Sequence, residues 1–394
     1  MMKKVLIGNI AIAEAIRLAR VDVISAYPIT PQTIIVEKLA EMVDSGELDA
    51  KYIRVDSEHS ALAAVYGASA AGSRVFTATS SHGLLYMYEM LWWVANSRLP
   101  VVMAVVTRSL GPPWNIHTDH QDALTIRDAG WIIGFAENVQ EVFDMTLQSY
   151  KISEDKRVLL PSIIALDGFI LSHTAEPLEL PSHEDIDGWL PPREPLPFVM
   201  KPGEGFAVGN LGPDEVTMEL RWYIWRAMER AKKVIIDIDK EYEEIAGRSY
   251  GGLTEKYRVE DADYIVVGMG SWSGDMKEAI DILRDEGYKV GLLRIRYIRP
   301  LPDFDIIKYC VPAKAVLVYD RAVSMGYGGI LAGEISSILR GKTPVKSVVA
   351  GLGGVDMRSE EFVDSIKRFI EEYEMDKDVE WLNTYWLLKG GDEG

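Results

Sequence analysis

The chain has 394 residues, of which 42 are basic and 60 acidic, so its formal net charge is −18. With 48% hydrophobic residues, it is expected to be a soluble globular protein of two or three domains. The acidic balance argues against nucleic-acid binding, because neutralising phosphates requires clustered Lys and Arg. The single Cys excludes a disulfide within the chain, and it excludes any four-Cys iron–sulfur or zinc site.

No segment is long and apolar enough to predict a membrane span. The longest apolar run is about six residues, at positions 101–106, whereas crossing a bilayer takes about 20. The basic start followed by Val5-Leu6-Ile7 hints at a secretory signal, but Asn9 and Glu14 interrupt that stretch. A cytoplasmic location is therefore expected. The chain has only four Gln and six Asn, which indicates a heat-adapted source.

Residues 1–171 alternate short β-branched runs with amphipathic stretches. Strands are expected at residues 21–26, 52–56, 74–79, 101–107, 131–135 and 162–166, and helices at 34–43, 61–71, 84–95 and 139–151. Apolar strands separated by helices predict a parallel sheet covered on both faces. This first part is therefore expected to be a doubly wound α/β domain.

Residues 172–255 break this pattern. Positions 172–213 hold eight of the 18 prolines and predict an extended linker or arm, and a helix is expected at 214–246 with Trp222, Trp225 and Met228 on one apolar face. Residues 256–394 then predict a smaller α/β domain. It has expected strands at 264–268, 290–295, 315–319 and 345–350, and helices at 277–285, 330–339 and 360–373.

Ligands of an open parallel sheet bind beyond the carboxyl ends of its strands, so the loops there are the places to search. The first strand is followed by Tyr27-Pro28-Ile29-Thr30-Pro31-Gln32-Thr33, in which two prolines make a rigid platform. Thr30 could simply cap the next helix, with Pro31 at its first position. A rigid hydroxyl at a helix N-terminus would also suit a carboxylate ligand.

The second strand is followed by Asp56-Ser57-Glu58-His59-Ser60. Ser57 is a plausible helix cap, and Glu58 in the first turn would be a favourable partner of the helix dipole. Glu58 is also placed where a catalytic carboxylate could be held, and His59 is more typical of a structural residue.

The fourth strand ends at Arg108, followed by Ser109 and then Pro112-Pro113-Trp114. An Arg that ends a buried apolar strand is costly unless it has an anionic partner. That partner could be a structural carboxylate or a bound substrate.

Three further features are weaker signals. A metal site could be made from His117, Asp119, His120 and Asp122, although such clusters are more often solvated. Residues 268–274, Gly-Met-Gly-Ser-Trp-Ser-Gly, are one residue off the dinucleotide-binding fingerprint, and a tight strand-to-helix turn explains them equally well. Cys310 is expected to pack as a small hydrophobe.

In chain order, these motifs resemble the α subunit of the several-chain 2-oxoacid:ferredoxin oxidoreductases of archaea. The resemblance covers almost the whole chain and rests on Gly8-Asn9, Tyr27-Pro28-Ile29-Thr30-Pro31, Ser57-Glu58-His59-Ser60-Ala61, Thr77-Ala78-Thr79-Ser80, Arg108-Ser109-Leu110, Arg299-Pro300-Leu301-Pro302, Asp320-Arg321 and Gly351-Leu352-Gly353-Gly354. One departure is Val355, where the family usually has Arg.

The resemblance implies a thiamine diphosphate enzyme with a pyrimidine-binding domain and a smaller domain like the C-terminal domain of transketolase. Glu58 would hydrogen-bond N1′ of the aminopyrimidine and so help to deprotonate the thiazolium C2. Residues 27–29 would contact the cofactor, and Thr30 and Arg108 would hold the 2-oxoacid. The implied reaction is oxidative decarboxylation to an acyl-coenzyme A, with electrons passed to ferredoxin.

The implied chemistry needs partner chains. Thiamine enzymes hold the diphosphate and Mg²⁺ with a Gly-Asp-Gly segment and a later Asn. This chain has no Gly-Asp-Gly segment, and no Asn lies between Asn210 and Asn383. Its one Cys cannot hold an iron–sulfur cluster. The diphosphate and Mg²⁺ are expected on a β subunit, and [4Fe-4S] clusters on partner chains that include γ and ferredoxin-like δ subunits. The aromatic residues Tyr86, Tyr88, Trp92 and Trp93 could form subunit contacts or an ordinary core face.

Three functions stay open from the sequence. The chain is a catalytic half-site subunit, a non-catalytic scaffolding subunit of the same complex, or a free-standing nucleotide-dependent dehydrogenase that uses residues 268–274. For the first, pyruvate and a branched-chain 2-oxoacid are the favoured substrates, and Pro112-Pro113-Trp114 would shape the acyl pocket.

Overall fold

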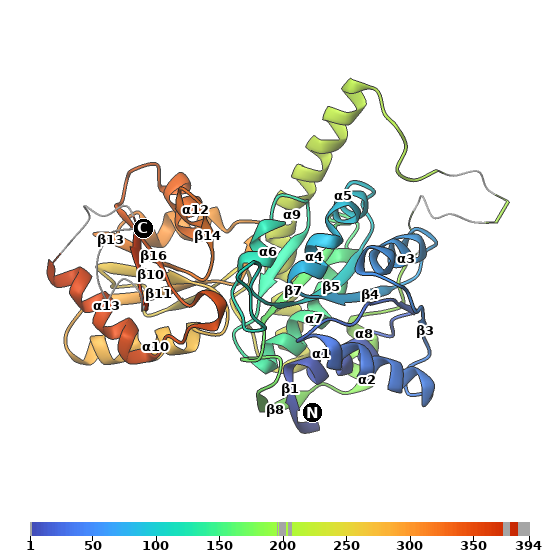
Figure 1. Ribbon diagram of the computed structural model, residues 1–394, viewed down its shortest axis with the longest axis horizontal. Coiled ribbons are helices and arrows are strands. Elements are labelled where there is room, and N and C mark those ends of the chain that lie inside the picture. The colour runs from blue at the N-terminus through green and yellow to red at the C-terminus, as the bar shows by residue number, and fades with distance from the viewer. Residues whose placement is uncertain (1, 195, 197–201, 204–206, 373–378, 385–394) are drawn as a thin grey trace.

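The computed structural model describes residues 2–194, 196, 202–203, 207–372 and 379–384. Two α/β units lie side by side, each built on its own sheet, and a long helix projects from the first (Figure 1). The expected α/β fold class with parallel sheets is confirmed.

The first unit is built on a seven-stranded sheet in the order β12-β6-β7-β5-β4-β2-β3. All neighbours are parallel except the β12–β6 pair. Its strands are β2 (Val23–Ile24), β3 (Lys51–Tyr52), β4 (Val75–Thr79), β5 (Val101–Thr107), β6 (Ile132–Phe135), β7 (Ser162–Asp167) and β12 (Tyr297–Arg299). Every residue of β4, β5 and β7 is buried, as expected for a sheet covered on both faces.

Helices cover both faces of this sheet. One face packs against α1 (Gly8–Leu18), α2 (Thr33–Asp44) and α7 (Val139–Glu154), and the other against α3 (Glu58–Ala70) and α5 (Tyr88–Asn96). Two short helices, α4 (Ser81–Tyr86) and α6 (Gln121–Thr125), complete the layer beside α3. The single helix expected at 84–95 is therefore wrong, because Met87 separates α4 from α5.

The strand order reverses between β2 and β4. From β2 the chain moves outward to the edge strand β3, and then it returns to β4 on the other side of β2. In open parallel sheets, ligands bind beyond the carboxyl ends of the strands at such a reversal. This is where the loop at residues 27–33 and the start of α3 lie.

The expected linker at 172–213 contains regular elements. β8 (Ala175–Leu180) pairs antiparallel with β1 (Met2–Ile7), and α8 (His183–Trp189) is closed by a capping box of Ser182 and Asp185. The expected linker or arm thus carries one strand and one short helix that the sequence pattern did not predict. The sequence pattern did not predict β8, because its side chains alternate between buried and exposed over only a few residues. Positions 195, 197–201 and 204–206 lie outside the described residues.

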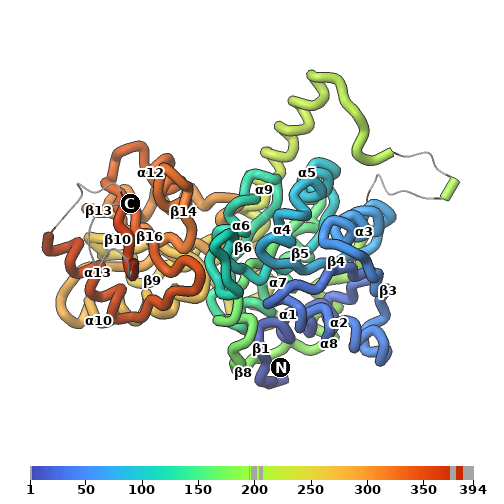
Figure 2. The backbone as a smooth tube through the Cα atoms, viewed as in Figure 1, coloured from blue at the N-terminus to red at the C-terminus, as the bar shows by residue number. Residues whose placement is uncertain are grey.

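Helix α9 (Asp214–Ala246) begins and ends where the sequence predicts. Its C-terminal half packs on α7, whereas its N-terminal half projects from the body of the molecule (Figure 2). Of the expected apolar face, Met228 packs against the core, whereas Trp222 and Trp225 are more than half exposed. No helix in the described part of the chain is long and apolar enough to span a membrane.

The second unit is built on a six-stranded sheet in the order β17-β16-β13-β10-β11-β9. Its strands are β9 (Thr254–Tyr257), β10 (Tyr264–Gly268), β11 (Val290–Ile295), β13 (Ala315–Asp320), β16 (Val345–Val349) and β17 (Val379–Trp381), and a small hairpin is formed by β14 (Val323–Ser324) and β15 (Gly328–Gly329). Its helices are α10 (Ser273–Asp285), α11 (Asp303–Cys310), α12 (Ile330–Leu339), η1 (Leu352–Gly354) and α13 (Ser359–Glu372).

The sequence predicts four of these six strands and misses the two at the sheet edges, β9 and β17, together with α11. Cys310 is buried there as expected, and burial raises the pKa of its thiol to about 12. The division into residues 1–171, 172–255 and 256–394 stays a prediction. Strand β12 belongs to the last part by sequence, yet it extends the sheet of the first.

Candidate active site at the carboxyl edge of the first sheet

The loop at residues 27–33 is held rigidly at the end of β2. The Asn9 side-chain amide donates to the Pro31 carbonyl at 2.9 Å, and the Gln32 amide donates to the Tyr27 carbonyl at 2.8 Å. Helix α2 begins at Thr33 and has no side-chain cap, so the alternative interpretation of Thr30 as a cap is wrong. Tyr27, Pro28 and Thr30 are exposed on this platform and Ile29 is half-buried.

Glu58 lies at the first position of α3, which Ser57 caps by accepting a hydrogen bond from the Ser60 amide at 3.1 Å. The expected cap is therefore confirmed, and it fixes where the Glu58 side chain begins. Glu58 is only 8% exposed. Among the described residues its carboxylate has no hydrogen bond and no ion pair, and its oxygens are not among the fully buried atoms, so water can still reach them.

Gly83 in α4 lets the side chains of Glu58 and Thr79 approach its backbone closely. A Cβ at that position would lie 2.7 Å from Glu58 Oε1 and 2.6 Å from Thr79 Oγ1. Both oxygens therefore lie beside Gly83. Thr79 Oγ1 and Ser80 Oγ are both buried without a hydrogen-bond partner. Buried polar atoms are nearly always paired, so this group of unpaired oxygens is suited to a polar ligand.

Arg108 follows β5 and is 6% exposed. Its Nη1 donates to the Thr30 carbonyl at 2.6 Å, while its Nε has no partner. No carboxylate of the described residues lies within ion-pair distance, so a structural ion pair does not account for this Arg. Burial lowers the pKa of its guanidinium, partly opposed by the charge of Asp122. The guanidinium carbon lies over the Trp114 ring, 4.9 Å from the ring centroid.

Asp122, which the sequence offered only as a possible metal ligand, joins two of these loops. Its Oδ2 accepts hydrogen bonds from the Ser81 amide at 2.8 Å and from the Arg108 amide at 3.0 Å. Burial, with the charge of Asp119, raises the pKa of Asp122 to about 8. These two hydrogen bonds fix the position of the start of α4 relative to the start of the loop that begins at Arg108. No signal in the sequence shows this, because an Asp in the first turn of a helix is ordinary.

The remaining candidates have other roles. His59 lies 3.6 Å from Glu89 at the surface, and no group of three or more potential metal ligands occurs in the described ranges. The turn at residues 268–274 faces the first unit: the Ser271 amide donates to Asp167 Oδ2 at 3.0 Å, and a Cβ on Gly270 would lie 2.8 Å from His120 Nε2. This turn is filled by a contact between the units, which argues against dinucleotide binding there.

Comparison with known proteins first defines a class. Residues 14–240 match the family described as pyruvate flavodoxin/ferredoxin oxidoreductase, thiamine diphosphate-binding, and residues 262–362 match pyruvate:ferredoxin oxidoreductase core domain II. The carboxyl edge of the first sheet fits a thiamine diphosphate-binding family. There, Glu58, Thr79 and Ser80 provide a carboxylate and two hydroxyls that could hydrogen-bond an aminopyrimidine. The chain belongs to the thiamine diphosphate-dependent 2-oxoacid:ferredoxin oxidoreductases.

Relatives that match nearly the whole length of the chain identify its family more closely. The chain is 48% identical to the pyruvate synthase subunit PorA of Methanocaldococcus jannaschii over 98% of this chain and 97% of the relative. It is 46% identical to the ketoisovalerate oxidoreductase subunit VorA of Pyrococcus horikoshii over 97% and 98%. It is thus a member of the α-subunit family that acts in multi-subunit 2-oxoacid oxidoreductases, which confirms the resemblance.

Solved structures share the fold. A 2-oxoglutarate:ferredoxin oxidoreductase from Magnetococcus marinus superposes with a TM-score of 0.72 at 21% identity, covering 93% of this chain and 65% of that one. An inactive β4 tetramer of a split-gene transketolase gives 0.55 at 12% identity, covering 92% and 97%. The expected pyrimidine-binding and transketolase-type architecture is confirmed at the level of the fold.

Proposed function

We propose that this chain supplies the pyrimidine-side half of a shared active site, in which Glu58 binds the aminopyrimidine of thiamine diphosphate and Thr30 and Arg108 bind a 2-oxoacid. The observation that carries the proposal is Glu58, which is only 8% exposed and has no hydrogen-bond or ion-pair partner among the described residues, beside the buried, unpaired hydroxyls of Thr79 and Ser80. When bound, thiamine diphosphate supplies the nucleophilic carbon that attacks the 2-oxoacid and accepts the electrons left by decarboxylation.

Each residue of the chain has a defined task in this proposal. Glu58, which is only 8% exposed, would hold a proton at N1′ of the aminopyrimidine. The residues at 27–29 form the rigid wall against which the ring is oriented. The unpaired Nε of Arg108 would donate to the carboxylate of the 2-oxoacid. The Thr30 carbonyl holds Nη1 of the same Arg, and the Thr30 hydroxyl would add a second contact to the 2-oxoacid.

The diphosphate half of the site belongs to a partner in this proposal. The sequence contains no Gly-Asp-Gly segment with a following Asn, so Mg²⁺ and the diphosphate would be held by a β subunit. The [4Fe-4S] clusters would lie on partner chains, including a γ and a ferredoxin-like δ subunit, and external ferredoxin would accept the electrons. Coenzyme A would accept the acyl group. The complex would act in the cytoplasm.

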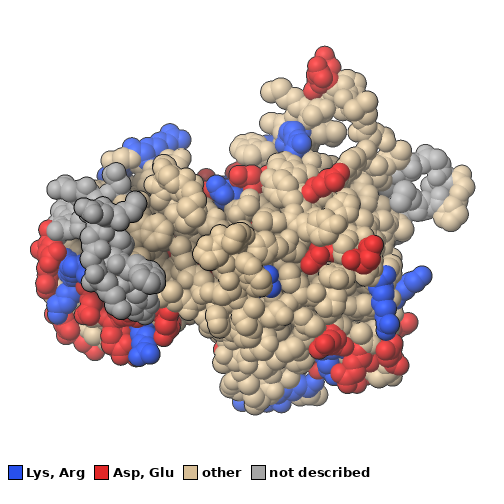
Figure 3. Space-filling view, in the orientation of Figure 1, with Lys and Arg blue, Asp and Glu red and all other residues tan. Residues whose placement is uncertain are grey.

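The surface beside the candidate site fits contact with a partner subunit. Tyr86 is 60% exposed, Tyr88 43% and Trp93 42%, so the alternative that these residues form a core face is wrong for them. The first domain shows few charged side chains over the centre of the face in Figure 3. Exposed apolar patches of this kind mark protein interfaces.

The substrate class is pyruvate or a branched-chain 2-oxoacid. Relatives named for pyruvate and for ketoisovalerate are similar to this chain to nearly the same extent, at 48% and 46% identity. Trp114 beside Arg108 narrows the space around the carboxylate and, with Pro112 and Pro113, would shape the acyl pocket. A turnover panel of 2-oxoacids with the assembled complex would rank the two.

The test is Glu58→Gln in the assembled complex. The amide can still accept a hydrogen bond but cannot act as the acid–base group at N1′, so turnover should fall by roughly 10²–10⁴-fold. Exposed Glu37→Gln in α2 is the matched control and should keep full turnover. Near-normal turnover of Glu58→Gln would instead favour a scaffolding subunit.

A further inference from the structure

The loop at residues 109–120 connects the candidate site to the second unit. At its far end, the Asn115 side-chain amide donates to the Gly353 carbonyl at 2.8 Å, and the Gly353 amide donates to Asp119 Oδ2 at 3.1 Å. Both groups of Gly353 belong to η1, at the carboxyl edge of the second sheet. A single residue of the second unit is thus bonded at two points of the loop.

A buried polar cluster fastens the base of the same loop. The His120 amide donates to the Arg321 carbonyl at 2.8 Å, and the His120 ring lies 2.8 Å from Asp167 Oδ1. Arg321 Nη1 donates to the other oxygen of Asp167 at 3.1 Å. All three side chains are at most 4% exposed. Groups this deeply buried and mutually paired hold a fixed geometry.

Glycines allow the loop to lie directly on the turn. Gly353 has φ +59° and Gly354 φ +81°, in the left-handed region that other residues rarely adopt. A Cβ on Gly354 would overlap the Cβ of His117. The turn at residues 351–354 is therefore shaped to receive this loop, a role that the sequence pattern did not reveal.

The near end of the loop reaches the proposed substrate site. Ser109 Oγ donates to the Asn115 carbonyl and accepts from the Asn115 amide, each at 3.0 Å, which closes the loop. Trp114, next to Asn115, lies beneath the Arg108 guanidinium and packs edge-on against His82, with ring centroids 6.1 Å apart. Trp114 is 54% exposed, so its position depends on the residues that flank it.

We propose that the second unit positions the substrate-binding Arg through this loop, with Asn115 as the positioning residue that keeps Trp114 on Arg108. The inference rests on the proposed function, because it takes Arg108 as the ligand of the 2-oxoacid carboxylate. The Trp114 ring beneath the guanidinium carbon shields that side of Arg108 from water and limits how far the guanidinium group can move. A pre-oriented fork binds a carboxylate more tightly than a mobile one.

The test is Asn115→Asp in the assembled complex. The new carboxylate keeps the oxygen that accepts from the His117 amide at 2.8 Å, but it places a second oxygen against the Gly353 carbonyl. We expect the KM for the 2-oxoacid to rise about tenfold, while kcat changes less than about threefold. Asp119→Asn keeps only one of the two oxygens that accept from the Gln121 and Gly353 amides. It should shift KM in the same direction, and it serves if Asn115→Asp does not assemble.

Lys277→Met is the matched control. Lys277 bridges the two units through Glu137 at 2.8 Å and Glu255 at 2.7 Å without touching the loop. The Lys277→Met variant should leave the KM for the 2-oxoacid unchanged while lowering the unfolding temperature of the chain. If loosening of the two units were the cause, both variants would raise KM alike, and the proposal would be overturned.

A double variant separates action through Trp114 from other effects. Trp114→Ala alone should raise KM, and adding Asn115→Asp should raise it little further, because the two changes disturb the same contact. Fully additive effects would refute the proposal. An unchanged KM in Arg108→Ala would refute the proposed function itself. If Arg108→Ala raises KM but Asn115→Asp and Asp119→Asn do not, only the positioning role is refuted.

Discussion

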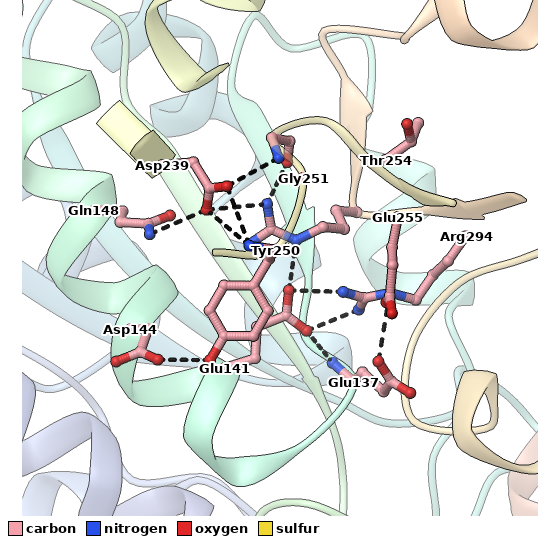
Figure 4. A network of polar contacts seen from close by, with 12 residues as sticks. Glu137, Glu141, Asp144, Gln148, Asp239, Tyr250, Gly251, Thr254, Glu255 and Arg294 are labelled. Carbon is pink, nitrogen blue, oxygen red and sulfur yellow. Dashed lines mark hydrogen bonds and ion pairs between the residues drawn. The ribbon is translucent and has the colours of Figure 1, made fainter. Parts of the chain in front are cut away.

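Two buried polar clusters of this molecule differ in how completely they are paired. The first joins α7 to β11 and is shown in Figure 4: Glu141 accepts from Arg294 Nη1 at 2.7 Å and from Arg296 Nε at 2.6 Å. Arg294 also donates to Glu255 at 2.7 Å. The second is the edge cluster of Glu58, Thr79, Ser80 and Arg108, in which several atoms have no protein partner.

The difference separates structure from function. Burying charges costs free energy unless opposite charges and hydrogen bonds replace the lost water. At Glu141 these replacements come from the two domains themselves, although Arg296 Nη2 stays unpaired. In the edge cluster they are missing at Thr79 Oγ1, Ser80 Oγ and Arg108 Nε, so the cost persists there until a ligand or partner supplies them. The paired cluster is thus expected to control stability, and the unpaired one to control binding.

The largest expected effect is on the paired cluster. Glu141→Gln removes the charge between two fully buried guanidinium groups and should lower the free energy of unfolding by about 3–5 kcal/mol. Chemical denaturation of the chain measures it, with exposed Glu244→Gln as control. Turnover per folded complex should be nearly unchanged. A loss of turnover without a loss of stability would contradict the division between the clusters.

Acid should weaken the same cluster. Burial acts to raise the pKa of Glu141, but the charges of Arg294 and Arg296 outweigh it and hold the pKa at about 2. The unfolded chain therefore takes up this proton at higher pH than the folded one, and stability is lost as pH falls from about 4.5 toward 2, by up to about 3 kcal/mol. The stability gap between the unchanged chain and Glu141→Gln, measured at pH 6 and pH 3, should narrow. A constant gap would show that the ion pair contributes no pH dependence.

At the unpaired cluster, Arg108→Ala should act on binding. We expect the KM for the 2-oxoacid to rise roughly 10–100-fold, since a charged hydrogen bond is worth about 1.5–3 kcal/mol. Thiamine diphosphate affinity should fall less, as titration of the assembled complex would measure, and exposed Arg358→Ala should change neither. The opposite ranking would place Arg108 on the cofactor.

The smallest effect is expected from Thr79→Val. Its hydroxyl has no partner, so its removal should leave stability unchanged or raise it by up to about 1 kcal/mol without ligand. Thiamine diphosphate should bind more weakly, up to about tenfold. Thr107→Val is the control, because its hydroxyl bonds to Thr118 at 2.8 Å and its loss should destabilise the chain. Equal destabilisation by both would show that Thr79 has a structural partner.

Much of the candidate site followed from the sequence. The order of strands placed Glu58 and Arg108 at one edge of a sheet, and the capping pattern of Ser57 was readable because it depends only on neighbours three residues apart. Asp122 and Asn115 were not recognised, since their partners lie 14 to 238 residues away in the chain. The exposure of Trp222 and Trp225 was not foreseen either, because helical spacing shows a face without showing what covers it.

The sequence by itself determined the α/β class, the long helix at 214–246 and the need for partner chains, since local periodicity and missing ligand residues are properties of the chain alone. Only the tertiary structure decided which buried groups are paired. Whether Glu141 or Glu58 meets an opposite charge depends on segments that folding brings together from distant positions. The two acids look alike in the sequence, both in the first turn of a helix. Their surroundings make one a structural group and the other a candidate for catalysis.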